Sequence, residues 1–90
     1  METNLEQLSK LLTNSEKVVG TRQVFKNLSK DRIRCVIISE DAEDNLRLKV
    51  IAACNGKGIR FYNAPSMKWL GEEVGIDVGA TTVGLLESEE

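Results

Sequence analysis

The run Ile33-Arg34-Cys35-Val36-Ile37-Ile38-Ser39 decides the fold, because it is a nearly continuous series of apolar and β-branched residues. A strand with one face in water alternates between apolar and polar residues, whereas a strand buried on both faces reads as a continuous apolar run. We therefore expect residues 33–39 to form a strand whose sheet is covered by helices on both faces.

Amphipathic segments and shorter β-branched runs alternate on either side of this strand. The expected elements are helix 4–13, strand 17–19, helix 21–30, strand 33–39, helix 44–55, strand 59–63, helix 66–75, strand 81–87 and a frayed tail at 88–90. Alternating helices and strands with short connections indicate right-handed crossovers and helices on both sheet faces. The sequence therefore predicts one domain over residues 1–90, an α/β fold organised as a three-layer α/β/α sandwich around a small mixed four-stranded sheet.

Residue types at the ends of the segments support these limits. Asp44 and Ser66 are the expected N-caps of the third and fourth helices. Gly56 or Gly58 would provide the left-handed residue that ends the third helix, and Gly75 ends the fourth. The apolar residues of the fourth helix are expected to point inward: Met67, Leu70 and Val74.

The segment 21–30 is expected to form an amphipathic helix with a basic face. At about 100° per residue its polar side chains share one arc: Arg22, Gln23, Lys26, Asn27 and Lys30. The opposite arc is apolar and can pack on a core: Val24, Phe25 and Leu28. The start of a helix carries partial positive charge that attracts phosphate, and Arg and Lys there can also reach guanine O6 and N7. This helix is therefore the candidate surface for nucleic acid.

Basic residues are not abundant in this chain, but they are concentrated in one segment of it. The 90 residues are 41% hydrophobic and 29% charged, with a net charge of −2. Residues 16–34 carry a local charge of +4, whereas residues 35–90 carry −5. A basic helix on an acidic body favours a defined nucleic-acid site over indiscriminate binding to polyanions. The alternative is a solvated helix face with chance basic content.

Other classes of function find little support in the sequence. The chain has no histidine, and Cys35 and Cys54 fall in apolar patterns typical of reduced core residues, so we expect neither an enzyme nor a cofactor. The acidic turn 40–44 is expected to be solvated and not to bind a metal. No apolar run could cross a bilayer, and the N-terminus is acidic where a secretory signal would be basic, so we expect a cytoplasmic protein.

Trp69 points away from the apolar side of the expected fourth helix. Packing on a neighbouring helix or on the N-terminal segment would explain it. An exposed Trp that contacts a protein partner is the other interpretation, since Trp is enriched at interfaces.

Two blocks of the chain resemble the kink-turn-binding ribosomal protein superfamily, and the resemblance spans residues 5–86. Gly20-Thr21-Arg22-Gln23-Val24-Phe25-Lys26 resembles the family signature Gly-Thr-[Asn/Lys/Arg]-[Glu/Gln]-x-x-Lys. Residues 70–80 resemble the family block Leu-Gly-x-x-x-Gly-[Ile/Val]-[Asp/Glu]-Val-[Pro/Gly]-Ala. Archaeal members usually have Asn-Glu where this chain has Arg22-Gln23, so the small bacterial branch of the family is the closer match.

The resemblance implies how each block would contact RNA. In that family the first block enters the major groove at a sharp RNA bend beside tandem sheared G·A pairs, and the second lies against a flipped-out nucleotide. Carried over, Arg22 and Gln23 face guanine edges and Lys26 a guanine or a phosphate, while Gly20 allows close backbone approach and Thr21 can cap the helix. The resemblance also implies that an apolar wall lies against the RNA, made of Ile76, Val78, Gly79 and Ala80. Lys30 is a further candidate RNA contact, and for Lys30, Arg32 and Arg34 phosphate contact and simple solvation are both open.

The resemblance also implies the partner. It is a structured RNA with a kink-turn, within ribosomal or regulatory RNA, which would make the protein part of a ribonucleoprotein such as the ribosome. Neither a membrane nor a small-molecule substrate is implied, and we expect a monomer. The alternative is a protein interaction module on the same fold that does not bind RNA. The block 20–26 separates the two, because relatives that lost RNA binding lost this signature, and it is intact here.

Overall fold

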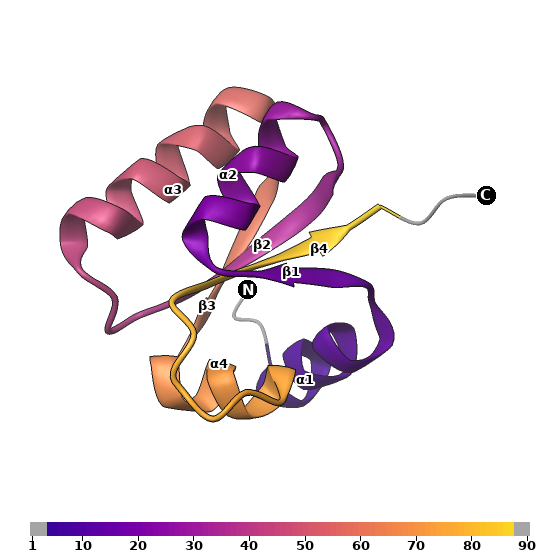
Figure 1. Cartoon of the computed structure of the whole chain (residues 1–90), viewed down its shortest axis with the longest axis vertical. Coiled ribbons are helices and arrows are strands. Elements are labelled where there is room, and N and C mark those ends of the chain that lie inside the picture. Colours follow the sequence, from indigo (N-terminus) through magenta and orange to yellow (C-terminus); the bar gives the residue numbers. More distant parts are fainter. Residues whose placement is uncertain (1–3, 88–90) are drawn as a thin grey trace.

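Four helices and four strands alternate along the chain in the computed structural model, which describes residues 4–87 (Figure 1). In order they are α1 (Leu5–Asn14), β1 (Lys17–Val19), α2 (Thr21–Ser29), β2 (Ile33–Ser39), α3 (Asp44–Lys57), β3 (Arg60–Ala64), α4 (Met67–Val74) and β4 (Thr82–Leu86). The predicted order is confirmed, and no strand end differs from its expected position by more than one residue. The tail expected at residues 88–90 lies outside the described residues.

The strands form one mixed sheet in the order β1-β4-β2-β3. Strands β2 and β3 are parallel, whereas β4 is antiparallel to both β1 and β2. Strands β1, β2 and β3 therefore run in the same direction and end at the same edge of the sheet, which we call the carboxyl edge. Because α2, α3 and α4 follow these strands, all three helices begin at the carboxyl edge.

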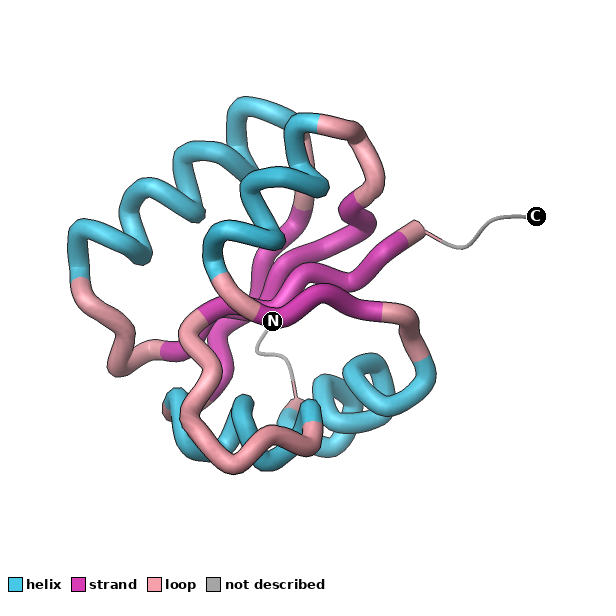
Figure 2. Tube along the Cα trace, viewed as in Figure 1, coloured by secondary structure: helices cyan, strands magenta, loops and turns pink. Residues whose placement is uncertain are grey.

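Two hydrophobic clusters lie on opposite faces of the sheet, as the long apolar strand predicts. Helices α2 and α3 cover one face and α1 and α4 cover the other (Figure 2). Cys35 and Ile37 of β2 belong to the cluster under α1 and α4, whereas Val36 and Ile38 belong to the cluster under α2 and α3. The predicted three-layer sandwich is confirmed.

Gly84 in β4 allows α2 to lie close to the sheet. A Cβ atom at this position would lie 2.7 Å from Cδ1 of Ile33 and 3.3 Å from Cγ2 of Val24 in α2. The methyl group would crowd both side chains, and the end of the Ile33 side chain would have to shift. The missing side chain at position 84 therefore leaves space for Ile33 and Val24 on this face of the sheet.

The helix ends confirm some of the expected caps and correct others. Ser66 caps α4, because its Oγ accepts a hydrogen bond from the backbone N of Trp69 at 3.0 Å. Asp44 was expected to cap α3 but is its first helical residue; Glu43 is the N-cap and makes no side-chain cap bond. Gly58, with φ of 68°, supplies the left-handed residue after α3, and Gly56 lies inside the helix.

Two polar-versus-apolar assignments were wrong. Asn27 was placed on the solvated arc of α2, but it is buried, and its Nδ2 donates to the backbone O of Gln23 at 2.8 Å. This bond to the preceding helical turn satisfies the amide donor, so the side chain can be buried at low cost. Met67 was expected to point inward but is 36% exposed, because it is the first residue of α4 and lies at the carboxyl edge.

Trp69 is half-buried and packs against the cluster formed by α1, α4 and the sheet. The packing interpretation of this residue is therefore the one that the structure supports. Trp69 therefore has a structural role at this cluster.

Both cysteines are free and buried, on opposite faces of the sheet. Burial raises the pKa of the Cys35 thiol and of the Cys54 thiol above the ordinary value. Both side chains therefore remain protonated near neutral pH and act as small apolar core residues. Among the described helices, none is both long and apolar enough to span a membrane.

Candidate nucleic-acid interface

The two sequence blocks meet at the carboxyl edge. The backbone N of Gly20 donates to the O of Thr82 at 2.8 Å, and the hydroxyl groups of Thr21 and Thr82 lie 3.3 Å apart. Since Thr82 follows the loop 76–81, these contacts bring the start of α2 beside that loop, and Figure 1 shows the chain before β4 passing the turn between β1 and α2. Residues about 60 positions apart in the sequence are therefore in contact, and the loop that precedes Thr82 lies near the start of α2.

Among residues 4–87, no group accepts a hydrogen bond from the first amides of α2. Gly20 is the N-cap, has φ of 102° and offers no side-chain acceptor, so the expected capping by Thr21 was wrong. Within residues 4–87, the backbone N–H groups of Thr21, Arg22 and Gln23 have no recorded acceptor; the first helical bond runs from Val24 N to Gly20 O at 3.0 Å. An open helix start of this kind attracts an anion through its N–H groups and its dipole.

Arg22 and Gln23 extend from this open turn, and Lys26 follows in the last turn of α2. All three side chains are exposed, and neither of the ion pairs found in the described chain involves Arg22 or Lys26. A guanidinium, a carboxamide and an ammonium group therefore lie exposed on the helix that starts with these N–H donors. We call Arg22, Gln23 and Lys26, with the first turn of α2, the basic tip.

Lys30 lies at the other end of α2. It is exposed and forms the C-cap, where its backbone N donates to Asn27 O at 3.2 Å. It lies eight positions after Arg22 along the helix, which is roughly 12 Å at 1.5 Å per residue. Lys30 is therefore on the flank of the basic tip and not part of its first turn.

The loop 76–80 exposes only part of the apolar wall that the family resemblance implied. Val78 is 71% exposed and Gly79 is also exposed, but Ala80 is 3% exposed and belongs to the core. Ile76 is half-buried and packs against the same cluster. The side chains of Ala80 and Ile76 therefore support the loop from below, and its accessible apolar surface is Val78 and the backbone of Gly79.

Gly71 in α4 allows this loop to pack directly against the helix. A Cβ atom at Gly71 would lie 2.3 Å from the backbone O of Val78 and 3.1 Å from Cα of Gly79. Gly79 in turn lies against Met67, since a Cβ there would be 3.0 Å from Met67 Cβ, and Ala80 N donates to Met67 O at 3.0 Å. The loop and the start of α4 are therefore in backbone contact, and exposed Met67 adjoins Gly79. The apolar periodicity of α4, which placed Met67 inward, did not predict this contact.

The acidic turn between β2 and α3 also lies at the carboxyl edge. Asp41 Oδ1 accepts a hydrogen bond from Met67 N at 2.8 Å, so this carboxylate satisfies the start of α4. Arg47 donates to Ser39 O at 2.7 Å and to Asn63 Oδ1 at 2.9 Å, which ties α3 to the ends of β2 and β3. Sequence reasoning missed Arg47, whose position in a helical pattern gives no indication of these partners. Across residues 4–87 we find no group of three potential metal ligands.

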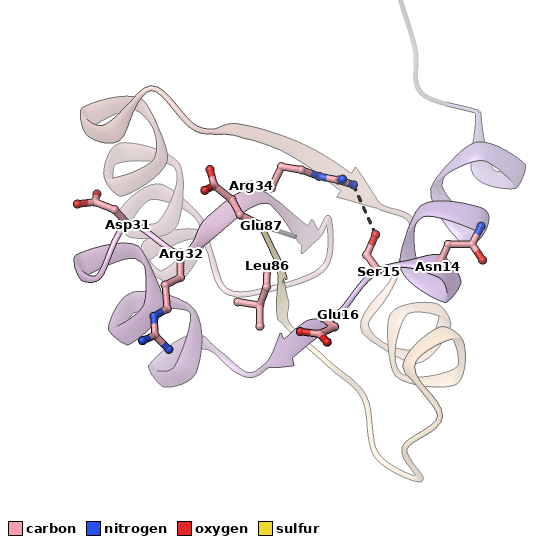
Figure 3. Close-up of a pocket in the computed structure, with 8 residues that line it drawn as sticks. All are labelled: Asn14, Ser15, Glu16, Asp31, Arg32, Arg34, Leu86 and Glu87. Carbon is pink, nitrogen blue, oxygen red and sulfur yellow. Dashed lines mark hydrogen bonds between the residues drawn. The ribbon is translucent and has the colours of Figure 1, made fainter. Parts of the chain in front are cut away.

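Arg32 and Arg34 lie at the opposite edge of the sheet, around an open hollow of about 690 Å³ (Figure 3). A β-bulge between Ile33 and Cys35 takes Arg34 out of the ladder, and its Nη2 lies 3.4 Å from Oγ of Ser15. Acidic side chains share the hollow, so it does not offer an anion a net positive charge. The residues that line it are Asn14, Ser15, Glu16, Asp31, Arg32, Arg34, Leu86 and Glu87. Neither arginine adjoins the basic tip.

Comparisons with known proteins agree on the family. Residues 3–90 match the ribosomal protein L7Ae/L30e/S12e/Gadd45 family. An RNA-binding protein of Halalkalibacterium halodurans is 42% identical over 71 residues, covering 79% of this chain and 87% of the relative. An RNA-binding protein of Staphylococcus aureus strain JH9 is 40% identical over 70 residues, covering 78% of this chain and 83% of the relative.

Solved structures share the fold. A protein of unknown function from Bacillus halodurans has a TM-score of 0.79 at 21% identity, covering 90% of this chain and 81% of its own. The 15.5 kD RNA-binding protein of Giardia lamblia has a TM-score of 0.78 at 19% identity, covering 99% of this chain and 80% of its own. The resemblance inferred from the two blocks is thus confirmed, and the chain belongs to the ribosomal protein L7Ae/L30e/S12e/Gadd45 family.

Proposed function

We propose that this protein binds RNA and recognises kink-turn motifs with tandem sheared G·A pairs. The observation that carries the proposal is the juxtaposition of the basic tip with the exposed apolar loop, through the contacts of Gly20 and Thr21 with Thr82. The names of the curated relatives, which describe RNA-binding proteins, support the same class of partner.

The chemistry of the two surfaces suits an irregular RNA bend. A kink exposes base edges that a regular A-form major groove hides, and sequence-specific RNA recognition favours such sites. Arg22 and Gln23 carry the donors and the acceptor that guanine edges require, and Lys26 can reach a guanine or a phosphate. The free N–H groups of Thr21, Arg22 and Gln23 add a second way to hold a phosphate, and Val78 offers an apolar contact for an unstacked base.

A non-enzymatic role fits the side chains of this protein. The chain has no histidine, and burial keeps both cysteine thiols protonated and away from solvent. A binding protein needs neither a general base nor a nucleophile, whereas acid–base and covalent catalysis need one of them positioned at a substrate. We further propose that the protein acts as a cytoplasmic monomer on a kink-turn in ribosomal or regulatory RNA.

A gel-shift titration against two RNAs tests the proposal. One RNA carries a consensus kink-turn, and its matched control replaces the sheared G·A pairs by Watson–Crick pairs at the same length. We expect the control to bind at least about tenfold more weakly at equal salt, the size of one lost bidentate base contact. Equal affinity for the two RNAs would rule out kink-turn recognition, and no binding to either would favour the protein interaction module.

The monomer proposal is tested in the same samples. Sedimentation of a saturated mixture should give one protein per kink-turn, and the free protein should sediment as a species of 10.0 kDa over the titration range. A concentration-dependent increase in the mass of the free protein would contradict it.

A further inference from the structure

Thr82 holds the start of α2 through both its backbone and its side chain. Its carbonyl O accepts from Gly20 N at 2.8 Å, and its Oγ1 lies 3.3 Å from Oγ1 of Thr21. Thr82 is 0% exposed, so water does not reach its hydroxyl, whereas Thr21 is half-buried. In the described part of the chain, the Thr21 hydroxyl is the partner recorded for the Thr82 side chain.

The same segment is held from the other side by β2. Ser39 is 0% exposed; its backbone N donates to Thr81 O at 2.9 Å and its Oγ to the same O at 3.3 Å. Thr81 and Thr82 therefore have a fixed position at the start of β4, immediately after the loop 76–80. The groups that bond to Thr82, which are Gly20 N and the Thr21 hydroxyl, are therefore positioned relative to that loop.

We propose that the Thr82 hydroxyl is a positioning group that sets the basic tip against the loop 76–80. The inference rests on the proposed RNA binding by these two surfaces. It accounts for the orientation of Thr21, whose hydroxyl lies against Thr82 although the neighbouring helix amides find no acceptor within residues 4–87. The hydroxyl pair fixes the first turn and leaves its N–H groups free for RNA.

The physical reason is the precision that a two-part site requires. Groups that bind one ligand must be held to within about half an ångström, and this depends on the residues that support them. The Gly20–Thr82 backbone bond fixes one point of the turn between β1 and α2. A second contact one residue later also limits rotation of the first helical turn about that point.

Replacing Thr82 by Val tests the inference, because Val keeps the shape and the backbone bond but removes the hydroxyl. Thr21 is half-buried and can bond to water instead, so we expect a native melting curve. We expect kink-turn affinity to fall about three- to tenfold, the effect of one ordinary hydrogen bond. The salt dependence of binding should not change, since no phosphate contact is removed.

Three controls separate positioning from general damage. Thr82→Ser, which keeps the hydroxyl, should restore affinity. Thr81→Val removes a neighbouring hydroxyl with no recorded hydrogen bond in residues 4–87, and should bind as the wild type. In a Thr21→Val background, Thr82→Val should have little further effect, because its partner is already gone.

Hydrogen exchange in the free protein tests the contact without RNA. Thr82→Val should speed exchange at the Val24 amide, the first bonded amide of α2, and leave the Ile37 amide of β2 unchanged. Native affinity and native exchange in Thr82→Val would overturn the inference. If the wild type fails to prefer the kink-turn while exchange still responds to Thr82→Val, the proposed function is wrong and the positioning contact is real.

Discussion

The starts of α2 and α4 lie at the same edge of the sheet but differ in whether their first backbone amides are capped. At α4, Ser66 Oγ accepts from Trp69 N at 3.0 Å, and Asp41 Oδ1 accepts from Met67 N at 2.8 Å. At α2, the N-cap is Gly20 and the first turn contains no acidic residue. No side chain within residues 4–87 accepts a hydrogen bond from that turn. Side chains of the protein accept hydrogen bonds from the first amides of α4, whereas the first amides of α2 receive no such cap within residues 4–87.

The other two helices strengthen this contrast. Helix α1 has Asn4 as a side-chain cap and Glu6 in its first turn, and α3 has Asp44 in its first turn. Of the helices in residues 4–87, α2 is therefore the one with neither a side-chain cap nor a first-turn acid. A cap stabilises the helix itself, whereas an open and basic start keeps its donors for a ligand. The difference supports the proposal that the start of α2 binds RNA, whereas the start of α4 has a structural role.

Arg22→Ala should produce the largest effect, at the open start. If the guanidinium makes a bidentate guanine contact, its loss costs roughly 1–3 kcal/mol of binding, or about tenfold to a hundredfold in affinity. Stability should hardly change, because Arg22 is exposed and forms no ion pair with the described residues. A gel-shift titration measures the first and thermal melting the second. Lys10→Ala, an exposed basic residue on the opposite face, is the control, and equal losses in both variants would refute the site.

Gly71→Ala should disturb the loop that faces the open start. The new Cβ would lie 2.3 Å from the backbone O of Val78, so the loop 76–80 must shift. We expect the free energy of unfolding to fall by about 1–3 kcal/mol and RNA affinity to fall with it. Urea denaturation gives the first value and titration with the kink-turn the second.

Gly56→Ala is the matched control for Gly71→Ala. Gly56 is also helical, but a Cβ there meets nothing within 4 Å, so the same change should stabilise the protein by roughly 0.5–1 kcal/mol. Stabilisation by both substitutions would show that the loop does not depend on close contact with α4.

Ser66→Ala should remove a cap from the satisfied start. The loss of its bond to Trp69 N should lower the free energy of unfolding by about 1 kcal/mol. RNA affinity should stay native at temperatures well below melting, because Ser66 makes no contact in the basic tip. A large loss of affinity without a loss of stability would mean that the start of α4 also binds RNA.

Lys57→Ala should have the smallest effect, at the far ends of the helices. Lys57 Nζ pairs with Asp31 Oδ1 at 2.9 Å, but both side chains are substantially exposed. Exposed pairs of this kind contribute about 0–1 kcal/mol, so melting should shift little and RNA affinity should not change. Comparing melting in low and high salt would reveal any larger contribution, which salt would weaken.

Sequence patterns within single segments were enough to predict most of the fold. The apolar run 33–39 predicted a strand covered on both faces, because side-chain alternation reports directly how many faces are buried. The sequence also predicted that Ser66 caps α4, because an N-cap bond joins residues only three positions apart and so depends on local sequence. The exposed residues of the basic tip were also predictable, because helical periodicity separates their arc from Val24 and Leu28.

The tertiary structure alone decided what happens where segments meet. Asn27 is buried and Met67 is exposed because the surrounding elements, and not the helical period, set the edge of each buried face. Ala80 lies in the core while Val78 is exposed, and this follows from the close approach of their loop to Gly71. The contact between Thr21 and Thr82 joins residues about 60 positions apart. A local sequence pattern indicates which secondary structure a segment forms and which of its faces is buried. Contacts between distant segments depend on which atoms the sheet brings together, and a local pattern does not contain that information.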